Sequence, residues 1–206
     1  MIERKDAVAT PSKGVDRRVQ RTRQLLQQAF LDIMQEKGFT AMNIQEITER
    51  ANLNRGTFYA HFADKYALLE EILHEQFRSL IEGMFPPAPQ WNRHILYALI
   101  QAVLEYFKSM YHNCSPFDII DPLLKHAVQE ELYRFFLNWL KYHRARERQI
   151  EVRVETLAGF MSWSIFGAAL QWSQENDSAS SEQIAREVLL VITEGIAQFV
   201  PTAFTT

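Results

Sequence analysis

The chain of 206 residues is 47% hydrophobic and 23% charged, which argues against a disordered chain. With only 7 Gly and 7 Pro, a turn-rich all-β fold is not expected. The single Cys excludes a disulfide framework and a cysteine-based zinc site. The first fifteen residues lack the apolar core of a signal peptide, and no run approaches the roughly 20 apolar residues that span a bilayer, so we expect a cytoplasmic protein with no membrane partner. The net charge of −3 is unevenly divided, with 11 Lys and Arg against 8 Asp and Glu through Lys65 and 11 against 17 thereafter, which favours a basic module joined to an acidic body.

A polar tail, residues 1–15, is expected to be flexible. After it, apolar residues recur at helical spacing through Leu26, Phe30 and Ile33, and they predict a helix that ends at Gly38. A short second helix should begin at Asn43, whose side chain can cap it. Glu46, three residues later, completes a variant of the capping-box arrangement.

A three-residue corner, residues 52–54, separates the second helix from a third. Asn52 can adopt the left-handed conformation that most residues avoid, and Asn54 can cap a helix from Arg55 to about Ala60. Because a helix of two turns is not stable alone, Phe58 and Phe62 must pack on its neighbours.

Longer helices make up the rest of the predicted fold. One apolar face predicts a fourth helix from after Asp64 to about Met84. Four more are expected at 92–112, at 116–146 with a break at Asp121–Pro122, at 149–174, and at 181–200 behind a capping box of Ser180 and Gln183. No stretch alternates with period two for long enough to form a strand. The sequence therefore predicts an all-α fold.

The two short helices and their corner, set against a longer first helix, outline a helix-turn-helix. The run from Gly38 to Leu69 closely resembles the DNA-binding region of the TetR/AcrR family of transcriptional regulators. The matching residues are Arg55, Gly56, Thr57, Phe58, Tyr59, His61, Phe62, Lys65, Leu68 and Leu69. The departures are Asn52 for the usual corner Gly, Asn54 for the usual Ser cap, and Thr48 for a common small Ala.

This resemblance implies an organisation and a function. It implies a DNA-binding domain over residues 16–65, with the helix-turn-helix motif at about 43–62, a linking helix at 65–84, and an effector-binding and dimerisation domain over 85–206. The expected function is that of a sequence-specific transcriptional regulator. We expect a homodimeric repressor that a small effector releases from a palindromic operator in double-stranded DNA. Neither a cofactor nor a metal ion is expected.

The DNA contacts implied by the resemblance lie around the third helix. Arg55 is the candidate for reading a base, because an arginine there can bond two acceptors of one guanine; a phosphate contact is an equal alternative. Thr57, Tyr59 and Lys65 are expected to contact phosphates, whereas His61 more simply supports the helix junction. The full set of candidates is Asn43, Gln45, Asn54, Arg55, Gly56, Thr57, Tyr59, His61 and Lys65. Four arginines, Arg17, Arg18, Arg21 and Arg23, form either an N-terminal arm or the solvated face of a helix.

The later helices predict a dimer interface and an effector pocket. The helix from Leu157 to Trp172 is apolar all round, so we expect one face to meet its own domain and the other a second subunit. The expected interface residues are Ala168, Trp172, Ile184, Val188, Val191, Ile192, Ile196 and Phe199. A largely apolar or aromatic effector is expected. For each candidate contact, packing in the protein core is the alternative to a ligand contact. The candidates are Tyr97, Phe107, Tyr111, Phe117, Phe135, Phe136, Trp139, Phe160 and Trp163.

Two alternative functions compete with a regulator: an all-α enzyme, and a helix-turn-helix that contacts proteins without binding DNA. A helical di-iron site would need two Glu-x-x-His pairs, and only Glu71 to His74 has that spacing. The chain has no phosphate-binding Gly-rich loop and no nucleophile elbow. Cys114 indicates a buried or loop thiol rather than a nucleophile. We therefore expect the chain not to be an enzyme.

Overall fold

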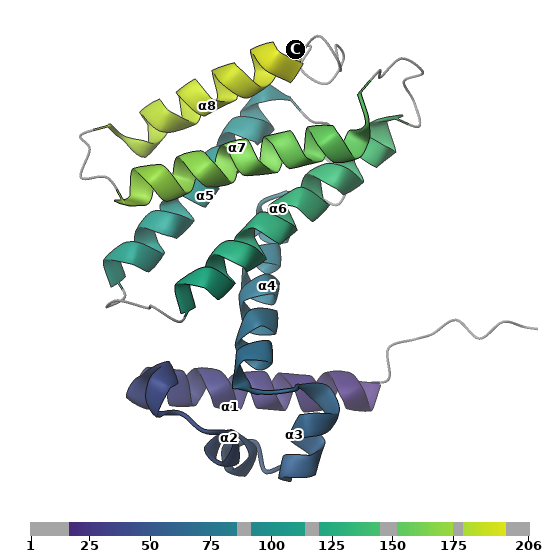
Figure 1. The fold of residues 1–206 in the computed structure, drawn as a ribbon, viewed down its shortest axis with the longest axis vertical. Helices are drawn as coiled ribbons and strands as arrows, with labels where there is room; N and C mark the ends of the chain where they lie inside the picture. Colours follow the sequence, from purple (N-terminus) through teal and green to yellow (C-terminus); the bar gives the residue numbers. More distant parts are fainter. Residues whose placement is uncertain (1–16, 86–91, 114–119, 145–151, 175–178, 197–206) are drawn as a thin grey trace, which may run out of the picture. The chain divides into compact units, whose positions relative to one another are not determined.

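The computed structural model describes residues 17–85, 92–113, 120–144, 152–174 and 179–196 (Figure 1). Within these ranges the regular secondary structure is helical throughout, which confirms the all-α prediction. The described residues divide into two compact units between Leu68 and Leu69. None of the described helices is long and apolar enough to cross a membrane.

The first unit consists of α1 (Arg17–Ala41), α2 (Ile44–Arg50), α3 (Arg55–His61) and the first residues of α4 (Lys65–Met84). Gly38 interrupts α1 with a φ of 77° and a ψ of 170°, so the regular helix ends where the sequence predicted and a further turn reaches Ala41. A glycine adopts this left-handed φ without steric cost.

A small apolar core holds these short helices together. The side chains of Leu26, Phe30, Ile47 and Phe58 are fully buried. The rings of Phe58 and Phe62 lie 5.8 Å apart, centroid to centroid, and the guanidinium of Arg23 on α1 lies over the Phe62 ring, as expected for a helix that depends on its neighbours. The core fixes α3 on the two helices before it.

The second unit contains the rest of α4 together with α5 (Arg93–Asn113), α6 (Ile120–Arg144), α7 (Val154–Gln174) and α8 (Ser181–Ile196). Helix α7 packs against α5, α6 and α8, and α5 also packs against α8. Figure 1 shows α7 between α6 and α8. The buried face of α7 includes Leu157, Ala158, Met161 and Ile165.

Two predicted helix boundaries are wrong, and one predicted cap forms only in part. Pro122 does not break α6 but lies in its first turn, where a missing N–H leaves no helical hydrogen bond unmade. Helix α7 begins at Val154, whereas the sequence predicted a start at residue 149. Residues 149–151 lie outside the described residues. At the start of α8 the Gln183 amide N–H donates to Ser180 Oγ at 3.3 Å, but the Gln183 side chain donates to Glu187, so only half of the predicted capping box forms.

Candidate nucleic-acid interface

Helix α2 begins at a complete capping box. Asn43 Oδ1 accepts the main-chain N–H of Glu46 at 3.0 Å, and Glu46 Oε2 accepts the main-chain N–H of Asn43 at 3.0 Å. This confirms the prediction made from the spacing of the two residues. Because both orphan donors find acceptors, the first turn of α2 is fixed locally.

Two ion pairs tie α2 to the end of α1. Arg50 donates two hydrogen bonds of 2.8 Å to the carboxylate of Glu36, and Lys37 pairs with Glu46. The hydrogen bonds from Arg50 hold the pKa of Glu36 below its ordinary value. Those from Lys37 and from the Asn43 main chain do the same for the pKa of Glu46. These side chains form their polar contacts within the protein and position α2 against the end of α1.

The corner and the cap of α3 are also as predicted. Asn52 has a φ of 53°, in the left-handed region. Asn54 Oδ1 accepts the main-chain N–H of Thr57 at 2.7 Å and its hydroxyl at 3.0 Å. A Cβ on Gly56 would lie 3.2 Å from that same oxygen, so the absence of a side chain at Gly56 protects the cap as well as exposing the backbone.

Arg55, Gly56 and Tyr59 are the candidates that α3 leaves most accessible. All three are exposed, and half of the Tyr59 surface is accessible. Within the described part of the chain, no hydrogen bond or ion pair engages the guanidinium of Arg55. The Tyr59 ring packs edge-on against Phe58 with centroids 5.6 Å apart. An uncommitted guanidinium therefore stands at the N-terminus of α3.

Thr57 and Gln45 are less available than the sequence implied. The single O–H of Thr57 points to Asn54 Oδ1, so it would have to rotate to donate to a phosphate. The Gln45 amide donates to Glu49 at 2.9 Å along the exposed side of α2. His61 is half-buried, with its ring centroid 6.4 Å from that of Phe62, next to the junction it was expected to support.

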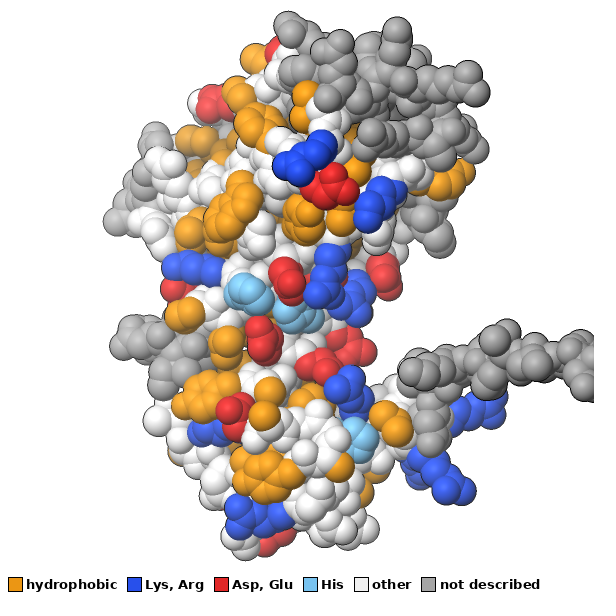
Figure 2. Space-filling model, turned by 45° about the vertical axis from the view of Figure 1, so that its right-hand side comes forward, with side chains coloured by type: hydrophobic (Ala, Val, Ile, Leu, Met, Phe, Trp, Pro, Cys, Tyr) orange, Lys and Arg blue, Asp and Glu red, His pale blue; other side chains and the backbone are white. Residues whose placement is uncertain are grey.

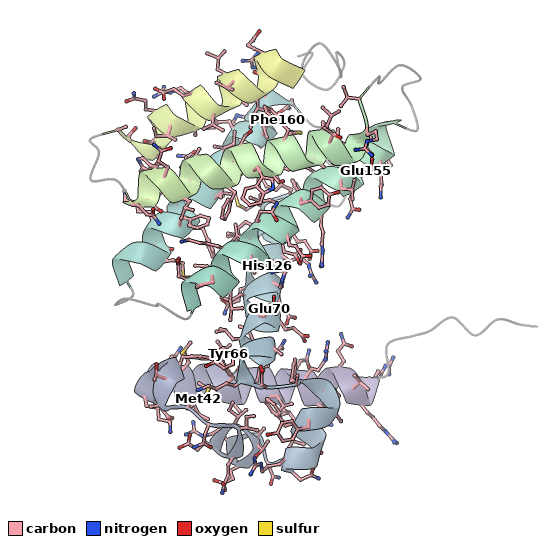
Figure 3. All side chains as sticks on the ribbon, in the orientation of Figure 1. Met42, Tyr66, Glu70, His126, Glu155 and Phe160 are labelled. Atoms are coloured by element: carbon pink, nitrogen blue, oxygen red, sulfur yellow. The ribbon has the colours of Figure 1, made fainter. Side chains whose placement is uncertain are left out.

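Lys65 is engaged by the protein. Its ammonium donates to the main-chain carbonyls of Phe39 at 3.0 Å and Met42 at 2.7 Å. The half-buried side chain also places Nζ 4.5 Å from the centroid of the Phe39 ring. Figure 3 shows Met42 and Tyr66, the neighbour of Lys65, on the elements that this contact joins. This contact could not be predicted from the sequence, because its acceptors are main-chain atoms.

The N-terminal arginines belong to α1. Arg17, Arg18 and Arg21 are exposed on its first turns, which favours the helical-face alternative. Arg23 differs from them, because its guanidinium carbon lies 5.2 Å from the centroid of the Phe62 ring. Arg23 therefore helps to pack α1 against the end of α3.

The aromatic candidates for an effector pocket fall into different environments. Phe107, Phe136 and Trp139 are buried in the core of the second unit, while Tyr97 and Phe135 are half-buried. Phe160 and Trp163 are 48% and 59% exposed, which corrects their assignment to an interior pocket. Their positions on α7 face away from the helices that cover its other side. Two further candidates are not described: the side chain of Tyr111 and all of Phe117 lie outside the described residues.

The predicted dimer residues are similarly divided. Val191 is 63% exposed, and Ala168, Trp172, Ile184 and Val188 are half-buried. Ile192 is completely buried within its own unit, so its assignment to an interface is wrong. The side chain of Ile196 and all of Phe199 lie outside the described residues. Leu190, which the sequence analysis did not single out, is exposed beside Val191.

A polar atom in the aromatic core was also missed. The hydroxyl of Tyr106 on α5 is buried, and no described residue hydrogen-bonds to it. Burial raises the pKa of Tyr106 to about 12. Its ring packs edge-on against Phe77 at 5.2 Å and Phe107 at 6.4 Å, centroid to centroid. The sequence could not identify this hydroxyl, because its burial among aromatic rings results from the fold.

A family of bacterial regulators matches most of the first unit in sequence. The sequence profile described as bacterial regulatory proteins, tetR family, matches residues 28–72. An uncharacterized HTH-type transcriptional regulator, YxbF of Bacillus subtilis (strain 168), is 42% identical over 73 residues, which are 35% of this chain and 19% of that protein. This chain therefore spans about a fifth of the length of that relative.

Two other proteins are similar over most of the chain. The HTH-type transcriptional repressor DhaR of Mycobacterium sp. (strain GP1) is 25% identical over 194 residues, covering 85% of this chain and 96% of DhaR. The crystal structure of Thermus thermophilus FadR, a TetR-family transcriptional repressor in complex with lauroyl-CoA, matches with a TM-score of 0.56 and 20% identity, covering 84% of this chain and 94% of FadR. At this identity the structural likeness establishes a shared fold.

Proposed function

The N-terminal domain of this chain belongs to the TetR family of bacterial regulators, and from this premise we propose that the whole chain is a sequence-specific DNA-binding transcriptional regulator, not an enzyme. One observation carries the proposal: α3 begins with an exposed Arg55 whose guanidinium has no partner among the described residues. The caps at Asn43 and Asn54 fix the two helices of the motif. An arginine held at a helix N-terminus and free of the protein suits base recognition in the major groove.

The contacts to DNA divide into two kinds. Arg55 reads a base, while Tyr59 and the third N–H of Lys65 bind phosphates. Main-chain N–H groups exposed at Gly56 add to the phosphate contacts, because a residue without a side chain admits the DNA backbone closely. Asn43, Gln45, Asn54 and Thr57 are secondary candidates, since their described polar contacts lie within the protein. His61 is also secondary, because its half-buried ring lies beside that of Phe62.

We infer a homodimer from the exposed apolar residues of α7 and α8. Phe160 and Trp163 lie one turn apart on α7, and Leu190 and Val191 are exposed on α8. Large apolar side chains left open to water favour association with another surface. A second copy of the chain is the partner that a palindromic operator requires, because two half-sites need two reading helices.

An apolar or aromatic effector remains part of the proposal. The described interior of the second unit is rich in aromatic rings, and Tyr106 adds one buried hydroxyl without a partner among the described residues. A ligand with one hydrogen-bonding group and an otherwise apolar body suits such surroundings. Release of the operator follows if the ligand binds better to the conformation with the lower DNA affinity.

The test is selection of bound DNA from a random pool by the purified chain at low salt. The proposal expects enrichment of a palindrome, with an affinity that falls steeply as salt rises. Failure to enrich any sequence would overturn it and favour the enzyme or the protein-contact module. Enrichment of a single unrepeated half-site would keep DNA binding and contradict the dimer.

A further inference from the structure

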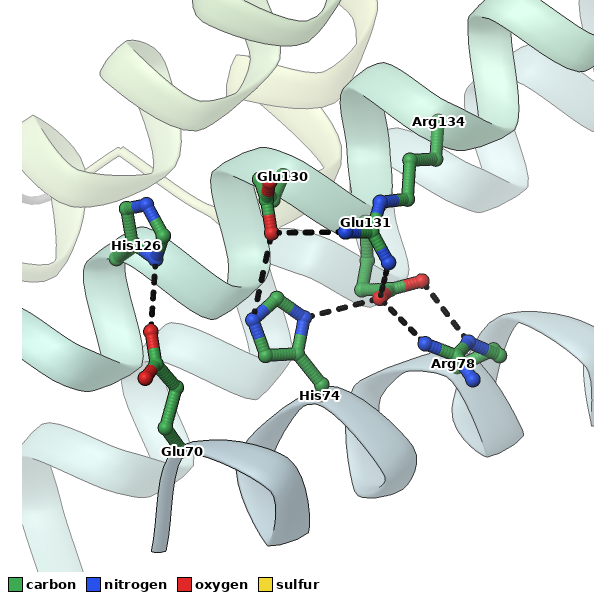
Figure 4. A network of polar contacts seen from close by, with 7 residues as sticks. All are labelled: Glu70, His74, Arg78, His126, Glu130, Glu131 and Arg134. Atoms are coloured by element: carbon green, nitrogen blue, oxygen red, sulfur yellow. Dashed lines mark hydrogen bonds and ion pairs between the residues drawn. The ribbon is translucent and has the colours of Figure 1, made fainter. Parts of the chain in front are cut away.

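Two histidines and a glutamate from different helices converge in the second unit. Glu70 and His74 lie one turn apart on α4, and His126 lies opposite them on α6 (Figures 3 and 4). One ligand atom from each of the three, a ring nitrogen or a carboxylate oxygen, lies within 4.8 Å of the other two. Glu70 Oε1 and His126 Nδ1 are 3.2 Å apart. The sequence could not reveal this group, because 52 positions separate His74 from His126.

A buried carboxylate orients the ring of His74. The Nδ1 atom of His74 is 2.9 Å from Glu131 Oε1, and Arg78 donates to both oxygens of Glu131, at 2.7 Å and 3.1 Å (Figure 4). A carboxylate whose two oxygens both accept from Arg78 can only accept at His74 as well, so a neutral His74 ring bonded to it carries its proton on Nδ1.

This arrangement leaves Nε2 of His74 as the atom with a free lone pair. Metal-binding histidines typically donate their other N–H to a carboxylate, which fixes both the tautomer and the ring. Nε2 is also 3.5 Å from Glu130 Oε2, so a second carboxylate is within reach. The described contacts thus supply an oriented imidazole, a second imidazole and two carboxylates.

The group is open to an ion from solution. The side chain of His126 is more than half exposed and that of Glu70 more than a third. Figure 2 shows histidine side chains gathered with acidic and basic ones at the surface. Bonds of about 2.1 Å in a tetrahedral site imply roughly 3.4 Å between ligand atoms. The three ligand atoms already lie within 4.8 Å of one another, and the exposed side chains of Glu70 and His126 have the rotamer freedom to adjust to that spacing.

We propose that Glu70, His74 and His126 form a binding site for a divalent transition-metal ion, with Glu130 as a fourth ligand, that joins α4 to α6. Two imidazoles with carboxylates suit Zn²⁺, Co²⁺ or Ni²⁺, whereas Mg²⁺ and Ca²⁺ prefer oxygen ligands alone. The site is separate from the residues proposed to contact DNA, and it extends the proposed function by adding a second kind of ligand.

The experiment titrates CoCl₂ into the full-length chain, free of any affinity tag and freed of metal with EDTA, and follows the visible absorption of bound Co²⁺. We expect one Co²⁺ per chain, displaced by Zn²⁺. His126→Gln and Glu70→Gln should each weaken Co²⁺ binding at least about tenfold, since even residues behind the ligands change metal affinity 10–100-fold. His94→Gln, at an exposed histidine on α5 that is not a member of the group, is the matched control and should leave the affinity within about twofold.

Glu131→Gln tests the orienting carboxylate, because it leaves all three ligands in place. It should weaken Co²⁺ binding about tenfold, and circular dichroism verifies that each variant is folded. The proposal is overturned if the wild-type chain gives no Co²⁺ absorption at millimolar metal, or if His126→Gln binds Co²⁺ as the wild type does. Since no DNA is present, neither result depends on the proposed regulatory function.

Discussion

The ammonium of Lys65, the first residue of α4, donates to the main-chain carbonyl of Met42 at 2.7 Å. A second hydrogen bond, of 3.0 Å, reaches the carbonyl of Phe39. An ammonium has three N–H donors, so two are committed within the protein and one is left for a phosphate. Lys65 therefore joins the start of α4 to the segment that follows Gly38, beside any contact that it makes to DNA.

Replacing Lys65 with alanine should have two separate effects. Loss of the hydrogen bonds to Phe39 and Met42 should lower the free energy of unfolding by about 2 kcal/mol, since bonds from a charged donor contribute about 1.5–3 kcal/mol. Loss of a phosphate contact should lower the slope of log affinity against log salt concentration by about one. Urea denaturation measures the first effect, and fluorescence anisotropy with operator DNA at several salt concentrations measures the second.

Lys108→Ala, which removes a cation from α5 that is not assigned to DNA, is the matched control for the salt slope. It should leave the slope at the wild-type value. A Lys65→Ala protein with reduced stability but an unchanged slope would leave Lys65 a structural role alone.

Arg55→Lys separates base reading from charge. Lysine keeps the positive charge but loses the two-pronged geometry that matches guanine. We expect the affinity for the selected operator to fall by about 1–3 kcal/mol, while affinity for unrelated DNA stays near the wild-type value. Competition binding with operators altered at one base pair in each half-site measures the change. Equal weakening on every sequence would instead assign Arg55 to the DNA backbone.

Tyr59→Phe removes a hydroxyl and keeps the ring that packs on Phe58 at 5.6 Å. A neutral hydrogen bond contributes about 1 kcal/mol, so affinity should fall about fivefold on all sequences with the salt slope unchanged. Tyr142→Phe, at an exposed tyrosine of α6, should not alter affinity. If Tyr59→Phe binds DNA as tightly as the wild type, its hydroxyl makes no phosphate contact.

The local features of the motif were predictable because the interacting groups lie close in sequence. The caps at Asn43 and Asn54 each join atoms three residues apart, and the left-handed Asn52 is determined by its own residue type. Pro122 was wrongly predicted to break a helix, because its effect does not depend on its nearest neighbours in sequence alone. Its tolerance depends on where the helix begins, and α6 begins at Ile120, which puts Pro122 in the first turn.

Interactions between distant segments could not be predicted in this way. His74 and Glu131 are 57 residues apart, and only the packing of α4 on α6 brings them together. The hydrophobic pattern of α7 likewise could not predict which of its faces is buried. Its sequence is apolar all round, yet which face is covered depends on its neighbours, and the structure leaves Phe160 and Trp163 on the open one.

Trp163→Glu should convert a dimer to a monomer. A charge placed at the centre of an apolar interface is costly to bury without a partner, whereas Trp163 is already 59% exposed, so the fold of the protomer should be retained. Light scattering coupled to size-exclusion chromatography measures the mass, which should be near the 24.1 kDa of one chain. Tyr142→Glu, at another exposed aromatic residue, is the control. A Trp163→Glu protein that stays dimeric would move the interface away from this face of α7.

Glu131→Gln should destabilise the second unit in a pH-dependent manner. Glu131 is 5% exposed and accepts hydrogen bonds from His74 and Arg78, and its pKa lies below the ordinary 4.5 in the folded chain despite the opposing effect of burial. A lowered folded-state pKa means that ionised Glu131 stabilises the fold above pH 4.5 and that this contribution is lost as the pH falls through the folded-state value. At pH 7 we expect a loss of about 2 kcal/mol in the free energy of unfolding, because bonds to a charged acceptor disappear while the half-exposed Arg78 can turn to water.

The pH dependence separates this charge effect from a packing defect. Urea denaturation should show the wild type and Glu131→Gln converging as the pH falls below 4.5 and through the lowered folded-state pKa, since the wild-type carboxyl then becomes neutral too. Glu130→Gln, one position away and more than a third exposed, should cost less than about 0.5 kcal/mol at every pH. A Glu131→Gln deficit in the free energy of unfolding that does not shrink as the pH falls below 4.5 would mean that the shape of the side chain matters and its charge does not. That outcome would also remove the reason for placing the His74 proton on Nδ1.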